Sequence, residues 1–290
     1  MKKWLIRGGI ALLVILGIAG TRLYFQLKEH GVIPRADYET VAPDIPRMER
    51  PAVLVFNKTN GYIHKDAITA ADALLTQIAD KNGWDIFFSN NGATHSQEVL
   101  QNFYLVVWNN VSGDVLTENQ RNSFKQWLEQ GGGWVGLHAT GGDFSYKWDW
   151  YAESLIGAQF VGHTMHPQFQ DADVYKTDKG LDLTSHLPSP WNVKQEEWYA
   201  FGSNPRDKGY EILLTLDEDS YSLNRDSWLG TEYMEGEHPI AWRHTVAEGR
   251  ALYSAIGHSA ATYQTPEYQE FINRSMQWAI KNSPPLKESP

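Results

Sequence analysis

One stretch indicates the fold, Gly131-Gly132-Gly133-Trp134-Val135-Gly136-Leu137-His138-Ala139-Thr140-Gly141-Gly142-Asp143. Its leading glycines end a helix, a short apolar strand follows over 134–137, and a histidine then enters a glycine-rich turn. Ligands of open parallel sheets bind where strands end, and nearby glycines let a ligand approach the backbone. We therefore expect His138 at a site on the carboxyl edge of a sheet. A histidine bonded to the backbone of a packed turn is the simpler alternative.

Three more apolar runs, at 52–57, 84–88 and 103–108, alternate with helical patterns upstream of this stretch. Such alternation is typical of right-handed βαβ units, whose parallel sheet is covered by helices on both faces. The sequence therefore predicts an α/β fold, a three-layer sandwich with a mainly parallel sheet. Later strand-like runs lie near 168–175, 197–201, 210–216, 240–244 and 250–256, and a last helix begins at Thr265-Pro266.

The first 51 residues differ from the rest. Lys2, Lys3 and Arg7 precede an uncharged run over 8–21, and four prolines follow within 29–51. We expect residues 1–28 to form an uncleaved membrane anchor with a single span, residues 29–51 a Pro-rich linker, and residues 52–282 the folded domain. Basic residues before the apolar run favour a domain outside the cytoplasm, periplasmic or extracellular.

The composition excludes several classes of function. The formal net charge is −10, and no basic run occurs beyond the N-terminus, which argues against nucleic-acid binding. The chain has no cysteine, so a thiol nucleophile, a thiolate metal site and a disulfide are excluded. Aromatic residues make up 13% of the chain, and exposed ones would suit stacking on sugar rings.

Three histidines follow predicted strands: His64, His138 and His258. If those strands are parallel neighbours, all three side chains reach the same edge of the sheet. His163 and His166 add a closely spaced pair. Imidazoles titrate near neutral pH, so such a cluster is equipped for proton transfer or for metal binding.

Several short motifs occur in an order that resembles the trehalose-utilisation (ThuA-like) family. They are Val53-Leu54-Val55-Phe56, Gly61-Tyr62-x-His64, Gly131 to Ala139, Glu197-Trp198-Tyr199, Asn204-Pro205-Arg206, Leu216-Asp217-Glu218-x-x-Tyr221, His238-Pro239-Ile240-Ala241-Trp242, and Gly249-Arg250 to Gly257-His258. The resemblance covers about residues 52–280 and leaves out the anchor and linker. It implies a fold similar to class I glutamine amidotransferases (flavodoxin-like) and a role with trehalose, other disaccharides and their keto derivatives.

The chemistry of that fold is absent here. The amidotransferase fold carries a Cys nucleophile on the turn after a strand, and Gly136-Leu137-His138-Ala139-Thr140 has histidine in that place. The fold's late catalytic histidine precedes Pro-Glu, whereas His258 precedes Ser259-Ala260. Thiolate attack on an amide is therefore unavailable to this chain.

Three functions agree with these residues. In the first, an enzyme acts on a carbohydrate, with His138 as general acid or base and His258 and His64 assisting it. One of the acids Asp143, Glu197 or Glu218 would then orient an imidazole or bind hydroxyls. Four aromatic residues would then contact the sugar: Tyr62, Tyr199, Tyr221 and Trp242. The second is a carbohydrate-binding module without turnover. The third is a metal-dependent hydrolase with zinc on several of the histidines, although no HExxH spacing supports a metal.

Overall fold

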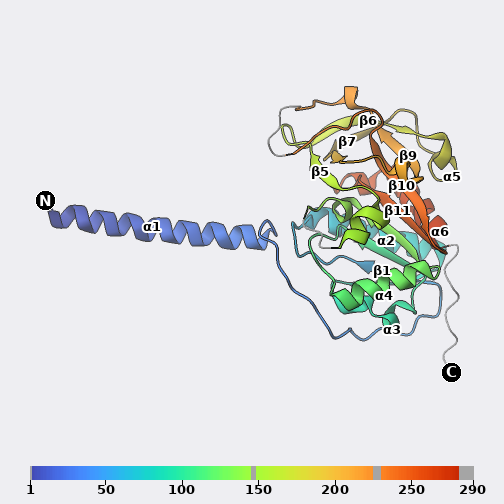
Figure 1. Ribbon diagram of the computed structural model, residues 1–290, viewed down its shortest axis with the longest axis horizontal. Coiled ribbons are helices and arrows are strands. Elements are labelled where there is room, and N and C mark those ends of the chain that lie inside the picture. Colours follow the sequence, from blue (N-terminus) through green and yellow to red (C-terminus); the bar gives the residue numbers. More distant parts are fainter. Residues whose placement is uncertain (1, 145–147, 225–229, 281–290) are drawn as a thin grey trace.

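The computed structural model describes residues 2–144, 148–224 and 230–280, with side chains from residue 12 onward. A nine-stranded sheet runs through the body in the order β2-β1-β3-β4-β11-β10-β9-β6-β7, and β5 pairs separately with β8 (Figure 1). The strands are β1 (Ala52–Phe56), β2 (Asp85–Ser89), β3 (Leu105–Asn109), β4 (Gly133–Leu137), β5 (Phe160–His163), β6 (Gln170–Lys176), β7 (Trp191–Glu196), β8 (Tyr199–Phe201), β9 (Glu211–Leu216), β10 (Pro239–Val246) and β11 (Gly249–Ser254). The helices are α1 (Lys2–Glu29), α2 (Lys65–Asn82), α3 (Gln97–Leu100), α4 (Glu118–Glu129), α5 (Leu181–Thr184) and α6 (Pro266–Ile280).

The four strands expected to be parallel neighbours are so. Strand β1 pairs in parallel with β2 and β3, and β3 pairs in parallel with β4. Strands β1, β3 and β4 are buried along their whole length, which explains their unbroken apolar sequences. Strand β11 extends the parallel set because it pairs with β4, and the later strands β10, β9, β6 and β7 then add antiparallel pairs.

Helices lie on both faces of this sheet, as the three-layer prediction requires (Figure 1). Helices α2 and α6 lie side by side, joined by the bond from Asn82 Nδ2 to Asn273 Oδ1 (2.9 Å), while α3 and α4 cover the other face. Helix α4 begins with a capping box formed by Thr117 and Gln120. Helix α3 is capped by the Ser96 side chain.

The sheet order decides where the candidate histidines lie. Strands β4 and β11 are adjacent and in register, with Leu137 opposite Ser254, so the chain after each strand leaves the sheet at the same edge. His138 follows β4 directly, and His258 follows β11 by four residues. His64 ends the loop after β1 and precedes α2, two strands away from β4.

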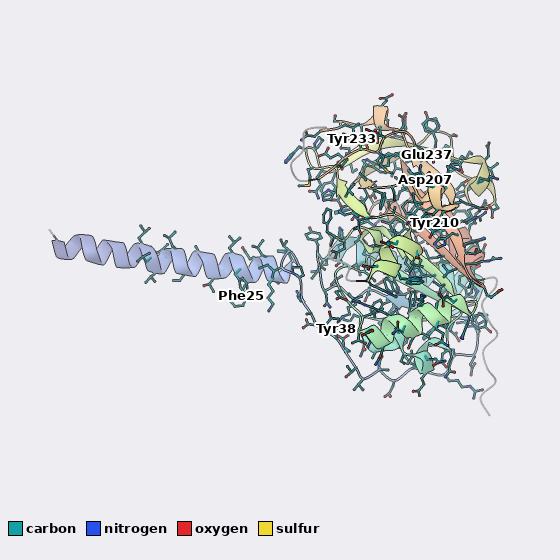
Figure 2. The ribbon with its side chains drawn as sticks, in the orientation of Figure 1. Phe25, Tyr38, Asp207, Tyr210, Tyr233 and Glu237 are labelled. Carbon is teal, nitrogen blue, oxygen red and sulfur yellow. The ribbon has the colours of Figure 1, made fainter. Side chains whose placement is uncertain are left out.

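Helix α1 spans 28 residues and stands away from the body, with Phe25 on the projecting part (Figures 1 and 2). Within the part of the chain whose side chains the structure describes, no helix is long and apolar enough to cross a membrane. The side chains of residues 1–11, which belong to the expected anchor, lie outside that part.

The segment expected to be a linker is irregular but packs on the body. From residue 34 to residue 50 it contains neither helix nor strand, as its prolines predict. Its Glu39 accepts bonds from Lys58 Nζ (2.5 Å) and from the Gly92 amide (2.8 Å), and the amides of Glu49 and Arg50 bond to Asp85. The segment is therefore held along the domain and is not a free spacer.

Candidate active site

His138 lies at the point where β4 ends, in a backbone conformation that few residues adopt. Its φ is +42°, a left-handed value that is uncommon outside glycine. Its ring is buried, and Nδ1 lies 2.7 Å from the carbonyl oxygen of Ala255, just beyond β11. Because a carbonyl only accepts hydrogen bonds, Nδ1 carries the proton and Nε2 keeps a lone pair. The fold thus directs a basic nitrogen into the site.

Glu197 faces this lone pair from the loop between β7 and β8. Its Oε2 lies 3.5 Å from His138 Nε2 and 3.2 Å from His258 Nδ1. Its other oxygen, Oε1, is held by Gln168 Nε2 at 2.6 Å and by His163 Nδ1 at 3.2 Å. Burial alone would raise the pKa of Glu197, but the bonds with His138 and His258 and the proximity of His163 hold it well below its usual value. Glu197 is therefore a buried, oriented carboxylate.

His258 is positioned by a second buried acid. The loop that carries it begins at Gly257, whose φ of +130° is a glycine conformation. The Glu196 carboxylate accepts bonds from the backbone amides of Gly257, His258 and Ser259, at 2.9 to 3.3 Å, and from the Thr262 hydroxyl. His258 Nδ1 then lies 3.2 Å from His138 Nε2. The neighbouring acids at the end of β7 thus have different roles. Glu196 binds the loop that carries His258, and Glu197 faces the imidazoles.

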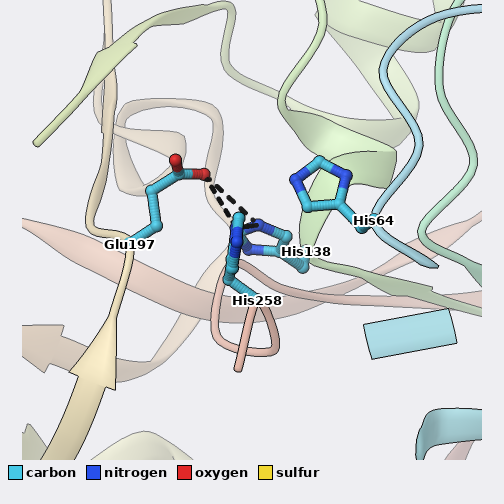
Figure 3. Close-up of side chains that lie close together, drawn as sticks. All are labelled: His64, His138, Glu197 and His258. Carbon is cyan, nitrogen blue, oxygen red and sulfur yellow. Dashed lines mark hydrogen bonds and ion pairs between the residues drawn. The ribbon is translucent and has the colours of Figure 1, made fainter. Parts of the chain in front are cut away.

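His64 completes the cluster, which Figure 3 shows in close-up. Its ring centroid lies 4.9 Å from that of His138 and 4.7 Å from that of His258. One ligand atom from each of His64, His138, Glu197 and His258 can be chosen so that all four atoms lie within 4.8 Å of one another. The Nδ1 atom of His64 is buried without a hydrogen-bond partner. Burial, followed by the nearby His138 and His258, holds the pKa of His64 well below its usual value, so the ring is neutral at pH 7.

Tyr199 contributes its hydroxyl rather than its ring. The hydroxyl lies 2.9 Å from His138 Nε2, and burial, then the charge of Glu197, raises the pKa of Tyr199 well above 10, so the hydroxyl donates. A Cβ on Gly142 would collide with the Tyr199 ring, and one on Gly141 with the Tyr253 ring. The room that these glycines leave is therefore filled by the protein's own aromatic rings, not by a ligand as the sequence suggested.

The other expected substrate-binding residues are spread more widely. Tyr62 is 49% exposed and contacts the His64 ring at 4.8 Å, so it lies on the rim of the cluster. Trp242 is fully buried and bonds to the Ile156 carbonyl, so a sugar cannot stack on it. The Tyr221 hydroxyl donates a hydrogen bond to the Glu232 carbonyl, and the Asp143 carboxylate accepts one from the Gly113 amide. These three residues therefore support the structure around the site.

Of the remaining histidines and carboxylates, some contact the cluster and others lie outside it. His163 contacts Oε1 of Glu197, the oxygen that does not face His138 and His258. His166 is exposed and does not belong to the cluster. Glu218 orients a histidine, as expected of an acid in the site, but that histidine is His238 at 2.8 Å. His238 Nε2 in turn bonds to the Tyr199 carbonyl, which places this pair behind the Tyr199 backbone.

Sequence reasoning missed Glu196, Gln168 and Phe169. The paired acids Glu196-Glu197 after an alternating strand were a signal for a buried carboxylate pair, but β7 itself was not predicted because its sequence, WNVKQE, is polar. Phe169 gave no signal in the sequence. It is 39% exposed and its ring centroid lies 4.8 Å from that of His258, so it flanks the cluster at His258.

Comparison with known proteins identifies the family of this chain. The family model for ThuA, described as trehalose utilisation, matches residues 52–279. The chain belongs to the ThuA family. A comparison with curated proteins gives no match.

Among solved structures, a putative ThuA-like protein from Bacteroides uniformis is 22% identical, with a TM-score of 0.69 over 84% of this chain and 96% of that chain. A putative ThuA-like protein from Parabacteroides merdae is 18% identical, with a TM-score of 0.57 over 83% and 93%. These likenesses show the fold. The ThuA domain of this chain has the fold similar to class I glutamine amidotransferases, with His138 on the turn after β4.

Proposed function

We propose that this ThuA-family chain is an enzyme of carbohydrate metabolism that acts on a disaccharide or a keto-sugar by proton transfer at the cluster of His64, His138, Glu197 and His258. The observation that carries the proposal is the directed lone pair of His138. Its Nδ1 is committed to the Ala255 carbonyl, so Nε2 is left as a base at the centre of a buried group of imidazoles and one carboxylate. The class of substrate comes from the family's link to trehalose utilisation and from the chemistry below.

A keto-sugar suits this site better than an unactivated glycoside. Hydrolysis of a glycoside usually needs two carboxyl groups on either side of the bond. Here Glu197 faces the cluster, whereas the oxygens of Glu196 are taken up by the loop amides and Thr262. A C–H bond next to a carbonyl is acidic enough for an imidazole: the proton passes to Nε2 of His138 and the electron pair moves into an enolate. Tyr199 O–H and His258 lie beside the same nitrogen to relay protons.

Exposed aromatic rings support a carbohydrate as the substrate. Tyr62 and Phe169 flank the cluster through His64 and His258 respectively. Phe169 also lines an open groove of about 480 Å³, together with Pro167, Gln170, Tyr221 and neighbouring polar residues. Aromatic faces beside polar groups suit neutral sugar rings, and the net charge of −10 disfavours an anionic substrate.

The test is a turnover assay of the purified protein on a panel of disaccharides and their keto derivatives. His138→Asn is the informative variant, because asparagine tolerates the left-handed backbone that this position requires. We expect kcat/KM to fall at least about a hundredfold, the lower range for the loss of a general acid or base. His166→Asn is the matched control and should keep wild-type turnover. If the wild-type protein binds a sugar of the panel but turns over none, the chain is a carbohydrate-binding module instead.

We further propose that α1 anchors the protein in a membrane, with the ThuA domain outside the cytoplasm. Lys2, Lys3 and Arg7 before the apolar run support this orientation. The apolar side chains of α1 from Leu12 to Phe25 are mostly exposed and contribute nothing to the core. Sedimentation of the full chain with membranes after a high-salt wash is the expected result. Release of the intact chain by that wash would contradict the anchor.

A further inference from the structure

Three atoms at the centre of the cluster lie at the spacing of ligands around one metal ion. His138 Nε2, His258 Nδ1 and Glu197 Oε2 form a triangle with sides of 3.2, 3.2 and 3.5 Å. For metal–nitrogen and metal–oxygen bonds of about 2.1 Å, neighbouring ligands lie about 3.0 Å apart in octahedral and about 3.4 Å apart in tetrahedral geometry. The triangle therefore fits a coordination sphere without movement of the backbone.

Hydrogen bonds account poorly for the same arrangement. His138 Nδ1 faces the Ala255 carbonyl and so carries a proton, which leaves a lone pair on Nε2 of the neutral ring, and the facing atom of Glu197, Oε2, is a carboxyl oxygen. Two acceptors thus face each other at 3.5 Å. The Tyr199 hydroxyl can donate to His138 Nε2 at 2.9 Å, whereas Glu197 Oε2 has beside it only the single Nδ1 proton of His258, which lies 3.2 Å from both acceptors. A shared cation would satisfy lone pairs that converge in this buried site, where unpaired acceptors cost free energy.

The groups behind the triangle are those that usually orient metal ligands. Metal-binding histidines commonly donate their second nitrogen to a backbone carbonyl, as His138 Nδ1 does to Ala255 at 2.7 Å. Ligating carboxylates are commonly hydrogen-bonded through their other oxygen, as Glu197 Oε1 is to Gln168 and His163. His258 is held through its backbone by Glu196, which leaves its ring free to bind.

We propose that His138, Glu197 and His258 bind one divalent first-row transition metal ion. Imidazole nitrogens with one carboxylate oxygen suit Zn²⁺, and also Mn²⁺, Fe²⁺ or Ni²⁺. Three protein ligands leave coordination positions open for a substrate oxygen, and the ring of His64 lies beside the triangle. The inference deepens the proposed function. With the ion bound, His138 would act as a ligand, the site would gain a Lewis acid for the sugar carbonyl, and His64, whose Nδ1 has no hydrogen-bond partner, would be the imidazole left to accept the proton.

The test uses the full-length chain in detergent, purified without a histidine tag and stripped with a chelator. Zn²⁺ and Mn²⁺ are titrated separately, and bound metal is measured by elemental analysis and calorimetry. We expect one equivalent per chain and a rise in Tm when the ion binds, because an ion that binds the folded state stabilises it. If neither ion binds stoichiometrically and neither raises the Tm, the site is a hydrogen-bonded cluster and the proposal is wrong.

Variants locate the ion at these residues. Glu197→Gln keeps the size of the side chain but removes the charge of the ligand, and His258→Asn replaces the imidazole ligand by a smaller amide. Each should weaken binding more than about a hundredfold, beyond the effect of losing an outer-shell partner. His166→Asn removes a nearby histidine outside the cluster and should bind one equivalent with wild-type affinity. Glu197→Gln binding as tightly as the wild type would overturn the assignment. The wild-type titration decides the proposal even if a variant fails to fold.

The two proposals fail separately. If the wild-type chain binds no metal yet converts a keto-sugar in a His138-dependent way, the proposed function is supported and the metal site is refuted. A chain that binds one equivalent through Glu197 and His258, but acts on no carbohydrate of the panel, keeps the metal and loses the proposed substrate.

Discussion

At the residue scale, the site depends on a histidine in a conformation and a tautomer that the surrounding backbone determines. The Ala255 carbonyl sets the proton of His138, and the Tyr199 hydroxyl is a donor to the lone pair that results. The sequence indicated that His64, His138 and His258 would share one edge, and the structure brings them together. The tautomer was not predictable, because the carbonyl that decides it lies 117 residues away along the chain.

Tyr199→Phe separates the hydroxyl from the ring. The ring packs in the core beside Gly142, so the substitution should change the free energy of unfolding by less than about 1.5 kcal/mol, the usual net value of one hydrogen bond. Turnover should fall about tenfold or more, because His138 loses the donor that faces Nε2. Parallel urea unfolding and kinetic assays check this. Unchanged turnover would show that the hydroxyl is only a packing feature.

Glu196→Gln should act on stability first. Both oxygens of Glu196 accept bonds from donors, so an amide nitrogen in place of one oxygen would face an N–H or O–H group. We expect a loss of about 2 to 3 kcal/mol, the value of hydrogen bonds to a charged acceptor together with the unsatisfied donors left behind. Urea unfolding measures the loss. Thr262→Ser, which keeps the hydroxyl, is the matched control and should lose much less.

His95 gives a pH dependence that does not involve the site. Burial lowers the pKa of His95 to about 3, from 6.5 in the unfolded chain, and its Nε2 accepts a bond from Trp108 Nε1. The unfolded state therefore binds the extra proton between those values, so this stability is present above pH 6.5 and is lost as the pH falls below it. At pH 5.5 the loss is about 1.4 kcal/mol.

Urea unfolding of the wild type and of His95→Gln, at pH 7.5 and pH 5.5, measures this contribution. The variant has no titrating group at this position, so its loss of stability between the two pH values should be smaller by about 1.4 kcal/mol. Equal losses in the two proteins would refute the assignment.

At the element scale, the strands that are apolar throughout were predictable, whereas the polar edge strand β7 was not. Strands β1, β3 and β4 are buried on both faces, so their sequences alone identify them. Strand β7 is the last strand of the sheet and pairs with a neighbour on one side only. Several of its residues are exposed and polar, so its sequence lacks the apolar run that identifies a buried strand. The candidate site depends on both kinds of element, because β4 carries His138 and the end of β7 carries Glu196.

The segment before β1 also behaves as a structural element without a regular pattern. Its Glu39 pairs at 2.5 Å with Lys58, whose side chain is 7% exposed. Glu39 itself is 36% exposed, but its removal leaves the buried Lys58 ammonium without its partner, so Glu39→Ala should destabilise the domain by about 2 kcal/mol, less than the loss from a fully buried pair. Lys58→Met tests the cause in a double-mutant cycle, because Glu39→Ala should cost much less when the ammonium is already absent. Additive effects of the two substitutions would argue against the pair.

At the scale of the whole molecule, the family match begins at residue 52, but the contacts of the body begin earlier. The Arg35 amide bonds to the Asn60 carbonyl at 2.6 Å, and the Ile63 amide bonds to the His30 carbonyl at 3.1 Å. A side chain on Gly31, whose φ is +73°, would collide with the Gly61 carbonyl. The end of α1 therefore rests on the loop that carries Tyr62 and His64, next to the candidate site.

This contact predicts that the folded unit and the family match have different starting points. A chain of residues 30–290 keeps the His30 carbonyl and keeps Glu39 beside Lys58, so its body should unfold at the same urea concentration as that of the full chain, while it leaves the membrane fraction. A chain of residues 52–290 loses the Glu39 carboxylate and the bonds to Asp85, and leaves Lys58 buried without its partner. It should be less stable by at least about 2 kcal/mol. Equal stability of the two shortened chains would mean that residues 35–50 lie on the domain without stabilising it.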